Sequence, residues 1–394
     1  MIVLSGRSLA FVLLGGAVWA CGSSKVAPAG DASCDDVELL VAASDHLSST
    51  VCGVPNHCEP GPRTTGVDLG KDPQLSTSNG RTFFINRLGT PGDLIFELDA
   101  KCGSPISELS VREDGVASVN PHDVAAAPDG SLFVVLYDVP RITIVRPGKS
   151  VAETVVEGTI DLSMYDEHDG NPQAESIQIV KVAGVWKAFV ALERLDDDTP
   201  LLVSTRDSYM LRIDVATRAV EGFVVLMGRN PFNPMAVSGS ALFLAEPGNF
   251  DAPDEPLAGI ERFDTATSTT RLLVPEHDLG GSVAEIAVTD GCGVAIVAGP
   301  QKTVNPTSLV AFDPDSGKVL SPPGAPLLGP TPGYDLQALA WRGNLLYVGD
   351  GRRGPTGYPV HVFERDAGTC NLHEVTGREL ELTQRPVALR PAAL

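Results

Sequence analysis

Five polar residues spread along the chain could act together as a cation site: Asp123, Glu175, Asn233, Glu285 and Asp335. Each stands where a strand of small residues is predicted to begin, as in HDVAAAPDG (122–130) and EIAVTDG (285–291). Oxygen ligands of this kind suit Ca²⁺, which takes about six to eight of them, so water or backbone carbonyls must complete the shell. Carboxylates brought together without a counter-ion repel one another. If the strands converge, either a cation such as Ca²⁺ is bound or the side chains point apart into water.

Other motifs with a known chemistry are missing or incomplete. PGKSV (147–151) resembles a phosphate-binding loop, but Thr143 stands where that loop needs its first glycine. DEHDGNPQAES (166–176) lacks the ligand spacing of an EF-hand, and no Gly-x-Ser-x-Gly, His-Glu-x-x-His or Gly-x-Gly-x-x-Gly occurs. The net charge of -21 argues against a nucleic-acid surface, which would have to attract phosphate. The sequence indicates no cofactor other than a Ca²⁺ ion.

A repeat of about 50 residues supplies the strands that would position the five polar residues. An apolar strand ending at a polar turn recurs, as in IFELDAKCG (95–103), VAFDPDSGK (310–318) and HVFERDAGT (361–369). A second apolar strand precedes each one, as in SLFVVLYD (131–138) and ALFLAE (241–246). Repeats of this length are typical of radial or stacked architectures. We therefore predict a six-bladed β-propeller of four-stranded antiparallel blades over residues 73–394. Residues 72–80 and 385–393 are alternative first strands for the blade that closes the ring.

The repeat resembles those of extracytoplasmic propellers with NHL-like or YVTN-like repeats. VAAAPDGSLFVV (124–135) carries the resemblance best, and AFDPDSGKV (311–319) resembles a turn of quinoprotein-type blades. The five polar residues would surround the mouth of the channel. Calcium-dependent lactonases and strictosidine-synthase-like propellers place Glu, Asn and Asp ligands there, so this similarity of residue type and location implies a metal site.

The N-terminus has the pattern of a bacterial lipoprotein signal. An apolar run from Leu9 to Ala20 is too short to span a bilayer and fits the core of a secretory signal. It ends in Val18-Trp19-Ala20-Cys21, which resembles the lipobox, although Trp19 is bulkier than the residue usual there. The resemblance implies cleavage after residue 20 and acylation of Cys21, and acyl chains of this kind anchor a protein stably. We expect a lipid-anchored protein of the cell envelope that faces the periplasm or the cell surface.

The other six cysteines are an even number, which fits up to three disulfides outside the cytoplasm: Cys34, Cys52, Cys58, Cys102, Cys292 and Cys370. The first three lie in a linker, residues 21–72, in which residues 36–46 are predicted to form a short helix. Cys102 and Cys370 follow the third strands of the first and last blades. A closed six-bladed ring makes those blades neighbours, so we prefer a Cys102–Cys370 bridge.

Two functions remain open at this point. Long loops between the second and third strands, such as PGNFDAPDEPLAG (247–259) and GRRGPTGYP (351–359), favour a binding or scaffold module for an envelope protein or a glycan. The alternative is a divalent-metal-dependent, lactonase-like hydrolase with its site at the channel mouth. An ion in an open channel would support the hydrolase, and a channel plugged by side chains would support the binding module.

Overall fold

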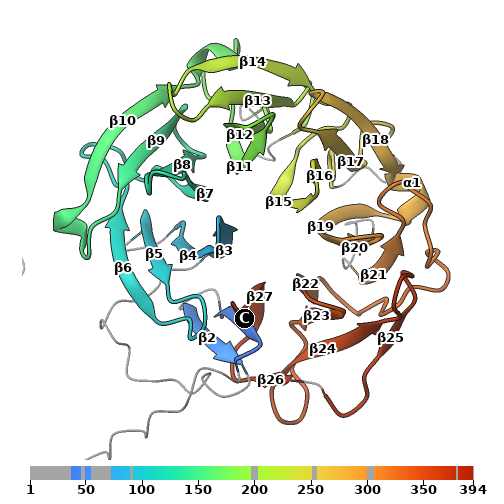
Figure 1. Cartoon of the computed structure of the whole chain (residues 1–394). Coiled ribbons are helices and arrows are strands. Elements are labelled where there is room, and N and C mark those ends of the chain that lie inside the picture. The colour runs from blue at the N-terminus through green and yellow to red at the C-terminus, as the bar shows by residue number, and fades with distance from the viewer. Residues whose placement is uncertain are drawn as a thin grey trace, which may run out of the picture. The chain divides into compact units, whose positions relative to one another are not determined.

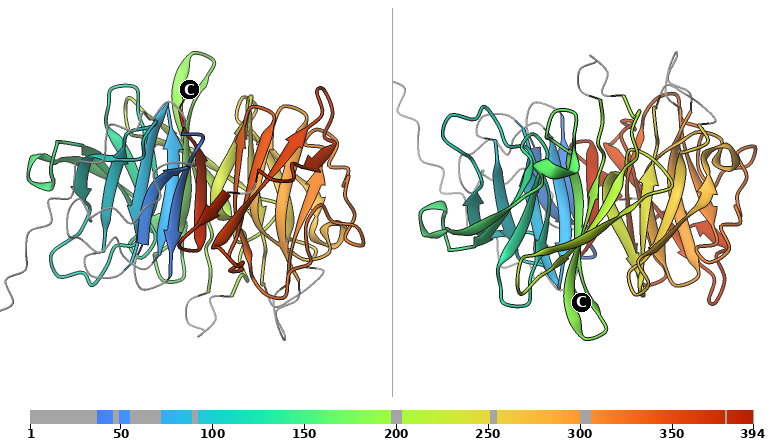
Figure 2. Two further views of the ribbon diagram at one scale, coloured as in Figure 1. Left: turned by 90° about the horizontal axis from the view of Figure 1, so that it is seen from below. Right: turned by 90° about the horizontal axis from the view of Figure 1, so that it is seen from above.

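The structure, a computed structural model, describes residues 37–45, 49–54, 72–88, 92–196, 203–250, 255–299, 306–378 and 380–393. In this part of the chain seven small antiparallel sheets surround a central axis as the blades of a β-propeller (Figure 1). Viewed from the side, the strands run between two opposite faces of the ring (Figure 2). We call the face at which the innermost strands begin the start face, and the opposite one the end face. Among the described helices, none is long and apolar enough to cross a membrane.

Blades 1 to 4 have four strands each, ordered here from the inside outward: β3 (Pro73–Ser78), β4 (Arg81–Asn86), β5 (Leu94–Leu98), β6 (Pro105–Ser110); β7 (Pro121–Ala126), β8 (Leu132–Leu136), β9 (Arg141–Arg146), β10 (Val155–Asp161); β11 (Ala174–Val182), β12 (Val185–Leu192), β13 (Tyr209–Asp214), β14 (Val220–Val225); β15 (Phe232–Ser238), β16 (Ala241–Glu246), β17 (Gly259–Asp264), β18 (Thr269–Pro275). Three short helical turns join or follow these strands: η2 (Val151–Glu153), η3 (Ser163–Tyr165) and α1 (Glu276–Leu279).

The remaining three blades depart from the four-stranded pattern. Blade 5 has three strands, β19 (Ser282–Thr289), β20 (Cys292–Ala298) and β21 (Thr307–Phe312). Blade 6 adds two short strands to the outer side of its third: β22 (Leu336–Arg342), β23 (Leu345–Asp350), β24 (Tyr358–Arg365), β25 (Leu372–Glu374), β26 (Leu380–Leu382). Blade 7 joins the two ends of the described chain: β27 (Pro386–Pro391), β1 (Leu39–Ser44), β2 (Ser49–Val54).

The ring has seven blades, so the expected six-bladed propeller was wrong. Blade 7 takes its two outer strands from before Pro73 and its inner strand from the C-terminal end, so neither segment shows the whole repeat. The helix expected over residues 36–46 is instead strand β1, whose six residues are all buried and pair with β2 and β27. The two segments treated as alternatives, β3 and β27, are the inner strands of neighbouring blades.

Small residues let the inner strands of the blades come close together near the axis. Ala125, Ala338 and Ala388 on inner strands are at most 2% exposed, because the strands crowd toward the axis and leave little room for side chains. Larger side chains fill the space between blades. Phe189 of blade 3 meets Phe263 of blade 4 with ring centroids 5.5 Å apart, within one buried cluster.

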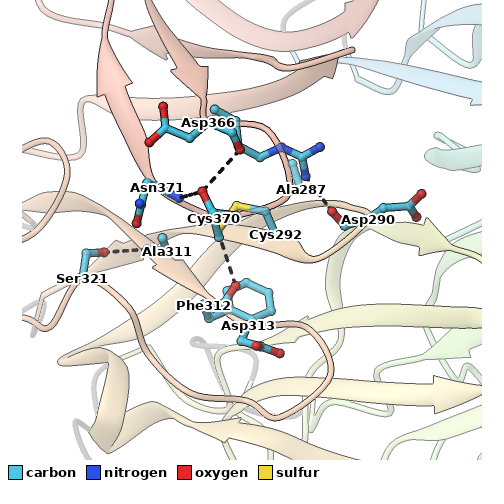
Figure 3. The surroundings of a disulfide bond; sticks show 12 residues. Ala287, Asp290, Cys292, Ala311, Phe312, Asp313, Ser321, Asp366, Cys370 and Asn371 are labelled. Atoms are coloured by element: carbon cyan, nitrogen blue, oxygen red, sulfur yellow. Dashed lines mark hydrogen bonds between the residues drawn. A yellow bond between two sulfur atoms is a disulfide. The ribbon is translucent and has the colours of Figure 1, made fainter.

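A disulfide joins Cys292 at the start of β20 to Cys370 before β25, linking blades 5 and 6 beside the Phe312 carbonyl oxygen (Figure 3). The preferred Cys102–Cys370 pair was therefore wrong, because blade 7 separates blade 6 from blade 1. Cys102 is disulfide-bonded, but not to Cys370. Cys21, Cys34, Cys58 and the side chain of Cys52 lie outside the described residues.

Candidate functional site

The five predicted site residues lie at the beginnings of five inner strands, near the start face. Four are within strands and one directly precedes a strand: Asp123 in β7, Glu175 in β11, Asn233 in β15, Glu285 in β19, Asp335 before β22. A bulge in β7, β11, β15 and β19 falls beside these positions and turns the side chains away from the regular ladder. Their placement along the blades agrees with the repeat, although the number of blades does not.

Most of these side chains reach the backbone of the next blade instead of a shared centre. Asp123 Oδ2 accepts a hydrogen bond from the Ile177 amide at 2.9 Å, and Glu175 Oε1 accepts one from the Asn233 amide at 2.9 Å. The contacts of the other three follow the same pattern or are local: Asn233 Nδ2 donates to the Ala284 oxygen at 2.8 Å, Glu285 Oε1 accepts from the Leu339 amide at 3.2 Å, and Asp335 Oδ2 accepts from the Gly333 amide at 3.0 Å. Four of the five therefore fasten consecutive inner strands together.

Burial changes the protonation of two of these carboxyl groups. It raises the pKa of Asp123 to about 6, although the Ile177 amide opposes the shift, and it raises the pKa of Glu285 to about 8. A protonated Glu285 is a poor ligand for a metal ion. Within the described ranges, no three His, Cys, Asp or Glu side chains are placed so that they could hold one ion.

A compact group at the start face, which we call the histidine cluster, consists of His122, Tyr137, Glu175, Glu193 and Arg87. His122 Nδ1 contacts Glu175 Oε2, and the imidazole stacks on the Tyr137 ring with centroids 4.1 Å apart. The Tyr137 hydroxyl donates to Glu193 Oε2 at 2.6 Å. Arg87 Nη1 lies 3.4 Å from His122 Nδ1. The cluster thus ties blades 1, 2 and 3 together at one end of the channel.

The electrostatics of the histidine cluster favour a neutral imidazole beside an ionised carboxylate. Burial lowers the pKa of His122, although the Glu175 charge opposes this. Burial opposes ionisation of Glu175, but the hydrogen bonds from His122 and the Asn233 amide and the Arg87 charge hold its pKa below the ordinary value. Burial and the Glu175 charge raise the pKa of Glu193, which favours its protonated form. The His122–Glu175 pair could move a proton, but both side chains are already engaged with each other.

Sequence analysis missed three buried acidic residues that end second strands or follow them: Glu193 after β12, Glu246 in β16 and Asp350 in β23. Glu246 lies beside Glu261. Burial raises the pKa of Glu246, and the charge of Glu261 raises it further. Asp350 accepts from Arg352 Nη2 at 2.6 Å and contacts His361, and these partners lower its pKa despite burial. An acid that closes an apolar strand, as in VALE, FLAE or YVGD, was the available signal.

A cavity of about 290 Å³ occupies the channel toward the end face. It is lined from the middle to the last residues of several inner strands, including Met235, Ile286 and Trp341. Two ionisable side chains border it, Glu285 of blade 5 and Arg390 of blade 7. Sequence analysis gave Arg390 no role. The two ends of the channel therefore hold different arrangements of charge.

Comparisons with known proteins identify the fold. No family model and no curated protein sequence matches the chain. Solved structures do: a Lactobacillus plantarum protein (11% identity, TM-score 0.55, covering 91% of this chain and 99% of that one), a putative 6-phosphogluconolactonase from Bacteroides uniformis (11%, 0.55, 90% and 99%) and the Dos1 propeller (15%, 0.50, 79% and 71%). At such identities the likeness concerns architecture alone. By fold, this chain is similar to β-propeller proteins.

Proposed function

We propose that the protein is a lipid-anchored binding module of the cell envelope that holds a protein partner and carries out no reaction itself. The supporting observation is a set of exposed apolar side chains at the outer strands of blades 2 and 3 and the segments next to them, which we call the apolar edge: Val151, Val155, Val156, Met164, Phe223, Val225 and Met227. Large exposed apolar patches on soluble domains mark interaction sites. A protein partner suits this surface better than a glycan does, because a glycan needs polar contacts.

Strand β14 provides both the side chains and a backbone for such a partner. It is the outermost strand of blade 3, next to β10 at the outside of blade 2 (Figure 1). Its exposed and half-buried positions alternate, and Phe223 and Val225 are 48% and 45% exposed. An outer strand with apolar side chains and unpaired backbone groups is a template for a further strand. The geometry therefore favours a partner that adds an extended segment to β14.

Aromatic neighbours hold Phe223 in place before any partner arrives. The Tyr209 ring stacks on Phe223 with centroids 4.5 Å apart, and the Tyr165 ring meets it edge-on at 6.0 Å. The Arg194 guanidinium in turn lies over the Tyr209 ring, 4.0 Å from its centroid. A fixed aromatic side chain loses little conformational freedom on binding, which is typical of residues that dominate an interface.

Photo-crosslinking in cells tests the apolar edge directly. A crosslinking amino acid at Phe223 should give a covalent adduct with a specific envelope protein. The matched control is Leu320, which is 40% exposed after β21 of blade 5 and should give none. Equal adducts from both positions, or none from Phe223, would contradict the proposal. An adduct with a second copy of this chain would replace partner recruitment by self-association.

The anchor is tested separately at Cys21. Cys21→Ser should move the protein from the membrane fraction to the soluble extracytoplasmic fraction, or leave it as an uncleaved precursor. Persistence of a matured Cys21→Ser protein in membranes would refute the lipid anchor while leaving the apolar edge untouched.

The long loops expected to form the interaction surface lie partly outside the described residues. Arg352, in one of these loops, pairs with Asp350.

Among the residues that the structure describes, no particular contact supports the metal-dependent hydrolase. A bound ion would need the carboxylate oxygens at the channel mouth, but Asp123 and Glu175 accept hydrogen bonds from the backbone of the next blade. Each of these hydrogen bonds directs one carboxylate oxygen toward the next blade instead of toward a shared ion. These contacts support the binding module over the hydrolase.

A further inference from the structure

The channel cavity contains an arginine whose hydrogen-bonding capacity is largely unused. Arg390 belongs to β27 and borders the cavity. A guanidinium carries five N–H donors. In the described part of the chain its hydrogen bond runs from Nη1 to the Leu389 carbonyl oxygen at 2.7 Å. The nearest charges are Glu285 and Asp123, which act on it without forming an ion pair among the described residues.

Two arginines elsewhere in the ring make more contacts with the fold than Arg390 does. Arg194 donates to the Asp207 oxygen and to Glu167 Oε2, each at 2.7 Å, and also lies over an aromatic ring. Arg206 contacts Asp166 and the Leu195 oxygen. Burial lowers the pKa of Arg390, although the Glu285 and Asp123 charges oppose this shift. A ligand with hydrogen-bond acceptors would give the remaining N–H groups of Arg390 a partner.

The surroundings define the chemistry of that acceptor. Arginine binds planar oxyanions through two parallel hydrogen bonds. Asp123 and Glu285 contribute at most two negative charges beside Arg390, so a dianion would be repelled more than a monoanion. Met235, Ile286 and Trp341 offer an apolar wall to a short hydrocarbon body. A volume of about 290 Å³ suits a ligand of only a few carbon atoms, at the lower end of small-molecule pockets.

We propose that Arg390 and Glu285 form a binding site for one small monocarboxylate in the channel cavity. The carboxylate accepts hydrogen bonds from the Arg390 guanidinium and from the protonated Glu285 carboxyl group, and its hydrocarbon part lies against Trp341. This site is separate from the apolar edge and does not depend on the proposed function. The shared chemistry is that of a small oxyanion, so inorganic phosphate is the competing source to be distinguished.

Isothermal titration of the full-length, detergent-solubilised protein with propionate tests the site. Propionate should bind, while the neutral propanamide and inorganic phosphate should bind at least tenfold more weakly. Arg390→Lys keeps the charge but loses the planar pair of donors, and should lower propionate affinity at least tenfold. The matched control, Arg353→Lys, changes an exposed arginine in the same way and should leave the affinity unchanged. Tighter binding of phosphate would overturn the carboxylate assignment, and no binding of either ion would overturn the site.

A second measurement needs no substitution at Arg390. With 5-fluorotryptophan incorporated, propionate should shift the ¹⁹F resonance of Trp341, which lines the cavity, and leave that of Trp186 on β12 in place. The chain has three tryptophans, and Trp186→Phe and Trp341→Phe identify the signals of these two. A Trp341 signal that stays unmoved at saturating propionate, or equal shifts of both signals, would overturn the proposal even if Arg390→Lys fails to fold.

Discussion

The two ends of the channel treat buried charge in opposite ways. At the start face, the histidine cluster pairs nearly every polar side chain with another, as in the Tyr137–Glu193 hydrogen bond of 2.6 Å. Toward the end face, Arg390 borders a cavity, and its guanidinium makes one hydrogen bond to the described part of the chain. A fully paired network rigidifies a structure, whereas an incomplete one leaves capacity for a ligand. The comparison suggests that one end holds the ring together and the other end binds.

Removing Glu175 should have the largest effect on stability. Glu175→Ala leaves the Asn233 amide without its acceptor and His122 without its partner, both in buried surroundings. We expect a loss of about 3 kcal/mol in the free energy of unfolding, measured with urea. Asp114→Ala, at an exposed position, is the control and should change it by less than about 0.5 kcal/mol. Equal effects of the two substitutions would remove the distinction between the two ends.

Glu285→Gln should stabilise the protein by an amount that increases with pH. The folded state holds the proton of Glu285 up to a pKa of about 8, whereas the unfolded chain releases it near the ordinary glutamate pKa of 4.5. Stability therefore falls as pH rises between these values, and the glutamine variant lacks this loss. We expect a gain of about 2 kcal/mol at pH 8 and almost none at pH 4, from urea unfolding at each pH.

The control for Glu285→Gln is Asp290→Asn, which removes a carboxylate from an exposed turn next to the same blade. It should show no such difference between the two pH values. The pKa of Asp123 is raised to about 6. The free energy of unfolding should therefore also fall between the ordinary aspartate pKa of 3.8 and pH 6, and this fall should persist in Glu285→Gln. If Glu285→Gln had the same free energy of unfolding as the original protein at both pH values, Glu285 would not be protonated in the folded state.

Arg390→Lys should have the smallest effect on stability. Among the described residues the Arg390 side chain makes one hydrogen bond, and lysine preserves the charge near Asp123 and Glu285. We expect the free energy of unfolding to change by less than about 1 kcal/mol, even though propionate affinity falls. A loss as large as that of Glu175→Ala would mean that Arg390 is a structural residue like those of the histidine cluster.

The strands and their polar starting residues could be predicted because both are local patterns. Asp123 and Glu285 stand directly before runs of small residues, and the same pattern recurs along the chain. Strand β1 could not be recognised: LLVAAS is rich in good helix formers, and all six residues are buried, so no alternation is visible. Its strand conformation comes from pairing with β27 at the opposite end of the chain.

The direction in which the site residues point was beyond the sequence. Asp123 and Glu175 were expected to converge on an ion, but each accepts a hydrogen bond from an amide of the neighbouring blade, which only the ring geometry reveals. Arg390 lies in a segment whose pattern resembles any inner strand. Its significance arises from a cavity that six inner strands enclose together, and no spacing along the chain encodes that.

The closing blade sets the order in which the ring can be completed. Ala42 pairs on one side with Val51, close in sequence, and on the other with Ala388, near the far end of the chain. The second pairing closes a loop of almost the whole chain, which is slow and entropically unfavourable until the other blades have brought the ends together. A chain cut short before Pro386 would retain six inner strands and an open seam, exposing the buried faces of β1 and β3 to other chains.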